Sequence, residues 1–199
     1  MSWPLRIGIT GGIGSGKSYV ARLVQEHFGL SLYDSDSRAR ELMTSSPDIR
    51  RGLIELLGDD AYLPDGSLNR PRVAEYLFRS EENAARVNAI VHPAVRRDGL
   101  RFAGETMRPA AIESAILIEA GLSDTVDLII AVAAPEDLRI QRAMQRDGAS
   151  EQQVRARIAR QMPQQLLLQQ ANYVVVNDGQ PLLPQLRRIP ELAKLPLPK

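Results

Sequence analysis

The residues with the clearest chemical implication lie between positions 10 and 19, in the segment TGGIGSGKSY. Gly11, Gly16, Lys17 and Ser18 fit the pattern G-x-x-x-x-G-K-[ST]. In such a loop, backbone N–H groups converge on phosphate oxygens, and the helix that follows contributes positive charge at its N-terminus. Lys17 is then placed to reach the β- and γ-phosphates, and the Ser18 hydroxyl to bind Mg²⁺. The segment predicts a site for a nucleoside triphosphate.

The segments on either side of this loop favour the same interpretation. Residues 5–10 form a short, mostly apolar run that is typical of a buried strand. Apolar residues then recur at helical spacing over residues 18–28, which predicts a helix that Gly29 ends. Side chains at the glycines inside the loop would obstruct the phosphates or the required backbone angles. A flexible turn without a ligand is the weaker alternative, and the dinucleotide pattern G-x-G-x-x-G is absent.

The composition is that of one ordinary globular protein, with 199 residues, 44% of them hydrophobic and 25% charged. The net charge is +1, so nothing favours a nucleic acid or a membrane surface as partner. The chain has no cysteine, which excludes disulfides, zinc–thiolate sites and thiol catalysis. Its apolar segments are too short to span a bilayer, and the first strand begins too early to follow a signal peptide. We expect a cytoplasmic enzyme.

The order of the segments predicts an α/β fold with a parallel five-stranded sheet between two helical layers. Besides the first strand, apolar runs predict strands at residues 30–33, 110–118, 128–133 and 173–176. A long helical insert separates the second strand from the third, and such inserts usually cover the strand ends where ligands bind. The expected parts are a nucleotide-binding core at 1–36, 108–134 and 165–189, a substrate-binding insert at 37–107, a helical lid at 135–164, and an extended tail at 190–199.

A second group of polar residues follows the second strand, in the segment DSDSRARE. If the chain stays extended, Asp34 and Asp36 point to the same face, beside the mouth of the phosphate loop. Arg40 follows one helical turn after Asp36. Asp36 could orient or deprotonate an acceptor hydroxyl while Arg40 holds an anionic group. Equally, one aspartate could cap a helix, with Arg40 as its i,i+4 partner.

A third group lies in the segment PEDLRIQRAMQRDG, which predicts a helix from Pro135 to Asp147. Arg139, Arg142 and Arg146 share one face of it. A capping box at residues 150–153 starts a second helix, from which further arginines project. A helix pair with arginines facing phosphates is a lid in nucleotide kinases, although a solvated basic face is the alternative.

Several motifs, taken in order along the chain, resemble dephospho-CoA kinases. The resemblance extends to about Gly179 and rests on spacing as well as residue type. The matching segments are IGITGGIGSGKS at 7–18, the pattern D-x-D-x-x-x-R at 34–40, DGSLNR at 65–70, VNAIVHPAV at 87–95, QRAMQRDG at 141–148, RARIARQ at 155–161 and ANYVVVNDG at 171–179.

This resemblance implies a P-loop kinase fold and transfer of phosphate from ATP, with Mg²⁺, to the ribose 3′-hydroxyl of dephospho-CoA. It implies catalytic roles for Asp36, Lys17 and Arg157, and an acceptor side formed by Asp36, Arg40, His92 and Glu119. The residues implied for ATP are Gly12, Ile13, Gly14, Ser15, Gly16, Lys17, Ser18, Tyr19, Arg142, Arg157 and Asn177. By themselves, His92 and Asn177 are more simply a structural histidine and a turn residue. A monomer or a weak homo-oligomer is expected.

The chain departs from the family pattern in two places. Residues 115–119 read AILIE where the family commonly has P-L-L-F-E, and the aspartate that precedes this motif is replaced by Ser114 or matched by Glu113. Asn69 stands where the family often has aspartate. Two other functions remain open on the sequence: another small-molecule P-loop kinase, and a nucleotide-dependent switch that hydrolyses ATP slowly.

Overall fold

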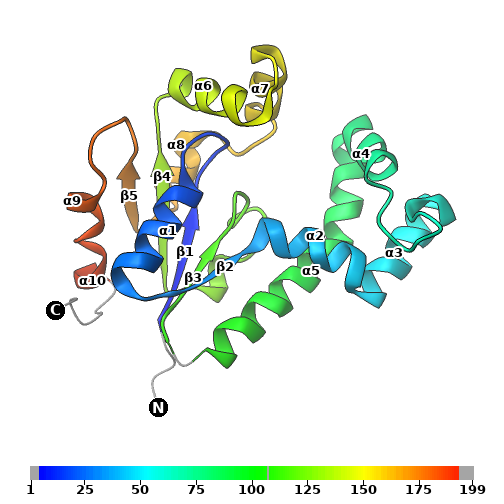
Figure 1. Ribbon diagram of the computed structural model, residues 1–199, viewed down its shortest axis with the longest axis horizontal. Helices are drawn as coiled ribbons and strands as arrows, with labels where there is room; N and C mark the ends of the chain where they lie inside the picture. The colour runs from blue at the N-terminus through cyan, green and yellow to red at the C-terminus, as the bar shows by residue number, and fades with distance from the viewer. Residues whose placement is uncertain (1–4, 107, 193–199) are drawn as a thin grey trace. The chain divides into compact units, whose positions relative to one another are not determined.

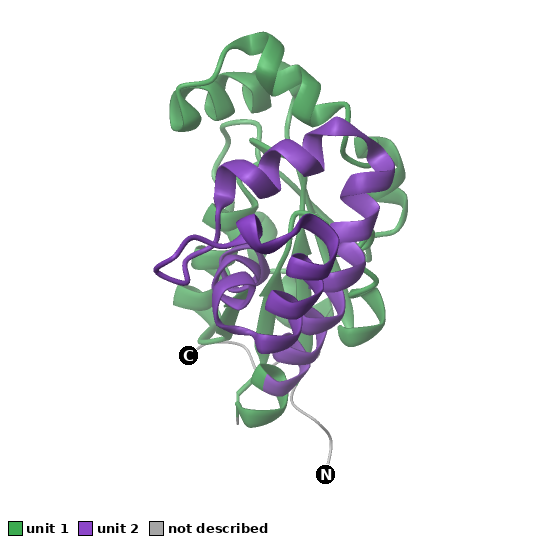
Figure 2. Ribbon diagram, turned by 90° about the vertical axis from the view of Figure 1, so that its right-hand side faces the viewer, with its two compact units in different colours: residues 1–34, 102–199 green, residues 35–101 purple. Residues whose placement is uncertain are grey.

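The computed structural model describes residues 5–106 and 108–192 (Figure 1). It contains two compact units, Met1–Asp34 with Phe102–Lys199, and Ser35–Arg101 (Figure 2). We call them unit 1 and unit 2. Within the described ranges, no helix combines the length and apolarity needed to cross a membrane.

Unit 1 is built on a five-stranded sheet in the order β2-β3-β1-β4-β5, with every neighbouring pair parallel. The predicted parallel five-stranded sheet is thus confirmed. Ile7 and Ile9 of the central strand are fully buried, as expected for a strand covered on both faces. The strands are β1 (Arg6–Thr10), β2 (Ser31–Asp34), β3 (Ala110–Glu113), β4 (Leu128–Ala133) and β5 (Tyr173–Val176).

Strand β3 is shorter than predicted, because it ends at Glu113 rather than continuing to Ile118. Ser114 still donates its N–H to the Ile9 carbonyl at 3.0 Å. Its hydroxyl then accepts the N–H of Ile116 at 3.3 Å, a local turn that competes with further strand pairing. The apolar residues that follow therefore form a turn, although their composition suits a strand.

The helices of unit 1 surround this sheet and extend beyond it. Helix α1 begins after Gly16, and Gly29 ends it, as predicted; both glycines are in the left-handed region. Figure 1 shows α6 and α7 beyond the end of the sheet where β1 and β4 terminate. The helices are α1 (Lys17–Phe28), η2 (Ser123–Thr125), α6 (Glu136–Asp147), α7 (Glu151–Ile158), α8 (Gln164–Gln169), α9 (Leu183–Leu186) and α10 (Ile189–Leu192).

The first residues of the extended tail predicted at 190–199 are helical instead, because residues 190–192 belong to α10 (Ile189–Leu192). Helix α9 (Leu183–Leu186) precedes it, within the predicted core. Leu182, Leu186 and Ile189 recur at helical spacing and are buried in the core of unit 1. The prolines of α9 and α10 lie in their first turns, where a missing N–H breaks no helical hydrogen bond. The remainder of the predicted tail, residues 193–199, lies outside the described residues.

Unit 2 is helical, in agreement with the predicted helical insert. Its core contains Ile49, Leu53 and Val73. Asn69, one of the departures from the family pattern, caps a helix by accepting the Arg72 N–H, and also donates to the Asp60 carbonyl at 2.8 Å. Its elements are α2 (Ser35–Ser45), α3 (Pro47–Leu57), η1 (Asp59–Ala61), α4 (Arg70–Arg79) and α5 (Glu81–Glu105), whose last residues belong to unit 1.

Candidate active site

The glycine-rich loop connects β1 to α1 as a tight turn. Ser15 donates its N–H to the Gly12 carbonyl at 3.1 Å, and the first turn of α1 closes on the Gly16 carbonyl. Gly14 and Gly16 have φ values of 74° and 87°, a conformation that side chains disfavour. The loop therefore has the strand–turn–helix setting that a phosphate-binding loop requires.

The glycines of this loop are also required because other parts of unit 1 approach it closely. A Cβ atom at Gly12 would lie 2.3 Å from Arg139 Nη2, and one at Gly14 would lie 2.0 Å from the Arg139 carbonyl oxygen. At Gly16 the obstacle is Asn177 Nδ2, at 2.2 Å. The sequence suggested that side chains here would obstruct phosphates; in the structure they would first collide with the protein itself.

We expect Gly14→Ala to destabilise the protein by about 3 kcal/mol or more, because it combines a positive φ with a backbone collision. Gly29→Ala is the matched control, since Gly29 has a positive φ of 65° with nothing within 4 Å of its Cβ position. The control should cost about 1 kcal/mol. Urea unfolding measures both. Equal losses of unfolding free energy for the two variants would show that the close approach of Arg139 to Gly14 does not affect stability.

Lys17, Ser18 and Glu113 meet at the start of α1. Ser18 Oγ donates to Glu113 Oε1 at 2.5 Å, and Lys17 Nζ lies 3.9 Å from the same oxygen. Glu113 is the last residue of β3, pairs in register with Ile9, and is only 5% exposed. A buried carboxylate is tolerated when it is paired and hydrogen-bonded, so the three residues support one another.

Glu113 was absent from the site residues predicted from the sequence. The available signal was an acidic residue directly after the apolar run 110–112, at the carboxyl end of a parallel strand, where ligands of α/β proteins bind. Of the two candidates for the family's aspartate, Glu113 is the one that contacts Lys17 and Ser18. Ser114 instead forms the turn that ends β3.

Asn177 and Arg142 lie on the other side of the loop. Asn177 is 7% exposed and donates Nδ2 to the Ser15 carbonyl at 2.9 Å. Arg142 donates to both oxygens of Asn177, at 3.1 and 3.3 Å. An open cavity of about 540 Å³ adjoins them, lined by Gly16, Tyr19, Arg142, Asn177, Gly179, Gln180, Pro181 and Leu182. The structure thus brings four of the residues predicted for ATP to one cavity.

The two helices predicted as a lid form a hairpin, and the capping box at Ser150 and Gln153 is present. At its tip, Asp147 accepts hydrogen bonds from Arg146 and Arg157, each at 2.8 Å. These two arginines, Arg146 foremost, hold the pKa of Asp147 below its usual value. Arg157, predicted as catalytic, is therefore engaged with a carboxylate of its own hairpin.

Glu119, predicted on the acceptor side, is exposed in the turn after β3. Its Oε1 accepts the N–H of Met162 at 3.4 Å, just after the helix hairpin. This contact lies within unit 1 and joins the turn to the hairpin's end.

The other residues predicted for the acceptor lie in unit 2. Asp36 and Arg40 are on α2, and His92 is on α5 before Pro93. The chain does not stay extended from Asp34 to Asp36, because β2 ends at Asp34 and α2 begins at the next residue. Asp36 therefore occupies the first helical turn of α2, and Arg40 lies one turn later on the same helix.

Comparison with known proteins agrees with this geometry. A family profile described as dephospho-CoA kinase matches residues 5–182. A dephospho-CoA kinase of Porphyromonas gingivalis is 43% identical over 197 residues, covering 98% of this chain and 96% of the relative. One from Bacteroides fragilis is 42% identical over 185 residues, covering 92% of this chain and 89% of the relative.

A crystal structure of a protein from Thermus thermophilus has the same fold, with a TM-score of 0.80 and 32% identity over 98% of this chain and 100% of that one. The profile and the relatives span nearly the whole chain, including the phosphate loop and the helix hairpin. On this evidence the chain belongs to the dephospho-CoA kinase family.

Proposed function

We propose that this protein transfers the γ-phosphate of ATP to the 3′-hydroxyl of the ribose of dephospho-CoA, giving coenzyme A and ADP. The observation that carries the proposal is the convergence of Lys17 and Ser18 on the buried Glu113 beside the glycine-rich loop. Family membership supplies the acceptor. A cysteine-free chain suits the reducing cytoplasm, where we place the reaction.

ATP would bind with its phosphates in the loop from Gly12 to Tyr19. Lys17 Nζ is held near the loop by Glu113 and would pair with the β- and γ-phosphates. The nucleoside would enter the cavity of about 540 Å³, where Arg142 offers a flat guanidinium for stacking. Asn177 holds both Arg142 and the loop backbone, so it would set the position of the base relative to the phosphates.

The residues near Lys17 also suit a magnesium ion. Ser18 Oγ and the Glu113 carboxylate are hard oxygen donors already in contact, as Mg²⁺ prefers. No group of three or more acidic or histidine ligands occurs in the described ranges, which fits an ion completed by phosphate oxygens and water. When bound, the ion would offset the charge of the phosphates; Ser18 would hold it directly, and Glu113 directly or through water.

Asp36 would orient the acceptor hydroxyl and accept its proton. Asp34, at the end of β2, pairs in register with Glu113. Asp36 follows Asp34 by two residues, so the length of the chain alone keeps the Asp36 Cα within about 7 Å of the end of β2. Arg40 and His92 would contact the acceptor's anionic and polar groups, and Glu119 would also bind the acceptor. Arg157 would release Asp147 and bind the transferred phosphoryl group, while the helix hairpin excludes water from the site.

Acceptor-dependent ADP release tests this function. With Mg-ATP, we expect dephospho-CoA to accelerate ADP formation by several orders of magnitude, whereas shikimate and free nucleosides leave it at the background rate. A related small-molecule kinase would respond to another member of this panel. A nucleotide switch would release ADP slowly whatever acceptor is present.

A further inference from the structure

The apex of the glycine-rich loop is held from both sides by the α6–α7 hairpin. Ile13 donates its N–H to Gln161 Oε1 at 2.8 Å, and its carbonyl accepts from Arg139 Nε at 3.0 Å. Gln161 lies just after α7, whereas Arg139 is near the start of α6. The Ile13 side chain also packs against the hairpin's apolar cluster, which includes Ile140 and Val154. One residue of the loop is thus fixed through its backbone and its side chain.

Arg139 is an unusual residue for this task because it is only 4% exposed. Burial lowers the pKa of its guanidinium, and the nearby Glu136 carboxylate offsets this only in part. Among residues 5–106 and 108–192, no carboxylate forms an ion pair with it. Its other hydrogen bond is to the neutral side chain of Gln164, at 3.3 Å. A buried cation without an ion pair is costly, and an anion that binds nearby would offset this cost. Its Nη2 adjoins Gly12, in the phosphate loop.

We propose that Arg139 and Gln161 are positioning residues that set the loop's apex for the triphosphate, with the Arg139 charge matched when the phosphates bind. This inference rests on the proposed role of the loop as the ATP site. Gln161 accepts the Ile13 N–H, while Arg139 donates to the carbonyl of the same residue. The position of the hairpin and the shape of the loop are thereby coupled.

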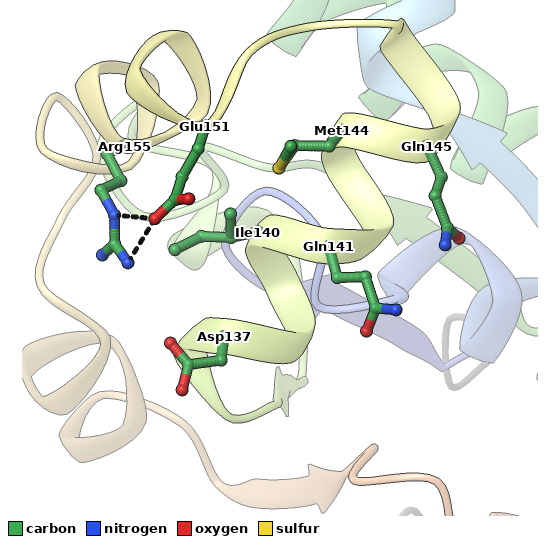
Figure 3. Close-up of a pocket in the computed structure, with 7 residues that line it drawn as sticks. All are labelled: Asp137, Ile140, Gln141, Met144, Gln145, Glu151 and Arg155. Carbon is green, nitrogen blue, oxygen red and sulfur yellow. Dashed lines mark hydrogen bonds and ion pairs between the residues drawn. The ribbon is translucent and has the colours of Figure 1, made fainter.

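Arg139→Gln tests this coupling, with Arg155→Gln as its matched control. Arg155 belongs to the same hairpin and bonds Glu151 and Glu136, each at 2.9 Å, without touching Ile13. Figure 3 shows it beside Glu151 on α7, in a cavity whose other lining residues belong to α6. The control therefore removes hydrogen bonds within the hairpin but leaves the hydrogen bonds of the glycine-rich loop intact.

We expect Arg139→Gln to lower kcat/KM for ATP by about 100-fold, the usual effect of misplacing reacting groups by about 1 Å. Calorimetry should show weaker binding of ATP and ADP by the variant, with the affinity for adenosine unchanged. Arg155→Gln should leave these constants near their wild-type values. A variant that only melts earlier, with full kcat and ATP affinity at a permissive temperature, would overturn the proposal. Equal losses for ATP and adenosine would do the same.

Gln161→Met provides the second test, since it removes the acceptor of the Ile13 N–H without shortening the side chain much. It carries the test if Arg139→Gln fails to fold. Because both residues act on Ile13, the double variant should lose less than the product of the single losses. Independent, multiplicative losses would contradict a shared role. The binding measurements need no phosphate acceptor. If the wild-type protein had no kinase activity but its affinity for ATP still depended on Arg139, only the proposed reaction would be refuted.

Discussion

Lys17→Ala should lower kcat by about 100- to 1,000-fold, the usual cost of removing one group that stabilises transition-state charge in a preorganised site. Lys17 Nζ lies beside the buried Glu113, and its side chain is 13% exposed, so its position is set before any nucleotide binds. The variant should still fold, because Glu113 keeps its hydrogen bond from Ser18. Steady-state ADP release with saturating dephospho-CoA measures the effect.

Arg22→Ala is the matched control for Lys17→Ala. Arg22 is an exposed cation of the same helix, so its loss changes the net charge equally and leaves the phosphate loop intact. Its activity should equal that of the wild type. Near-normal turnover by Lys17→Ala would remove the phosphate-loop assignment, and with it the proposed mode of ATP binding.

Asp36→Asn should reduce kcat by about 100- to 10,000-fold, the range expected when a general base is lost. The substitution keeps the size of the side chain and one acceptor oxygen but removes the charge and basicity. Because Asp36 is proposed to act on the acceptor, the affinity for ATP should remain unchanged. Parallel measurements of kcat by ADP release and of ATP affinity by calorimetry separate these effects.

The control for Asp36→Asn is Asp48→Asn, because both aspartates lie in the first turn of a helix of unit 2. A carboxylate there interacts favourably with the helix dipole, so both variants lose this stabilising contribution. Only Asp36→Asn should affect catalysis. Identical kinetic behaviour of the two variants would leave Asp36 as a residue that merely stabilises the start of α2.

Local patterns predicted much of the fold because the signals were contained in short segments. The predicted strands at 128–133 and 173–176 agree with β4 and β5 to the residue, since both are uninterrupted runs rich in β-branched residues. Gly29 and Gly148 end their helices in the left-handed conformation that other residues avoid. The phosphate loop was equally easy to predict, because its motif and the strand and helix beside it are contiguous in the sequence.

Features that depend on tertiary contacts were harder to predict from the sequence. Arg139, Arg142 and Arg146 share a helical face, and the sequence pattern does not distinguish their roles. In the structure they bind the Ile13 carbonyl, Asn177 and Asp147 respectively, and only packing could reveal these different partners. The contacts of Glu113 with Lys17 and Ser18 likewise depend on the pairing of β3 with β1, which the sequence alone does not show. The helical start of the predicted tail was also missed, because residues 190–192 are held in α10 next to Ile189, which is buried in the core of unit 1.

The most direct test of the central claim is the position of the phosphate in the product. Wild-type protein is incubated with Mg-ATP and dephospho-CoA, and the product is examined by mass spectrometry and phosphorus NMR. Coenzyme A carrying a new monoester phosphate on the ribose 3′-hydroxyl, formed in equal amount with ADP, is the expected result. ADP without a phosphorylated acceptor, or a phosphate on another hydroxyl, would contradict the proposed reaction.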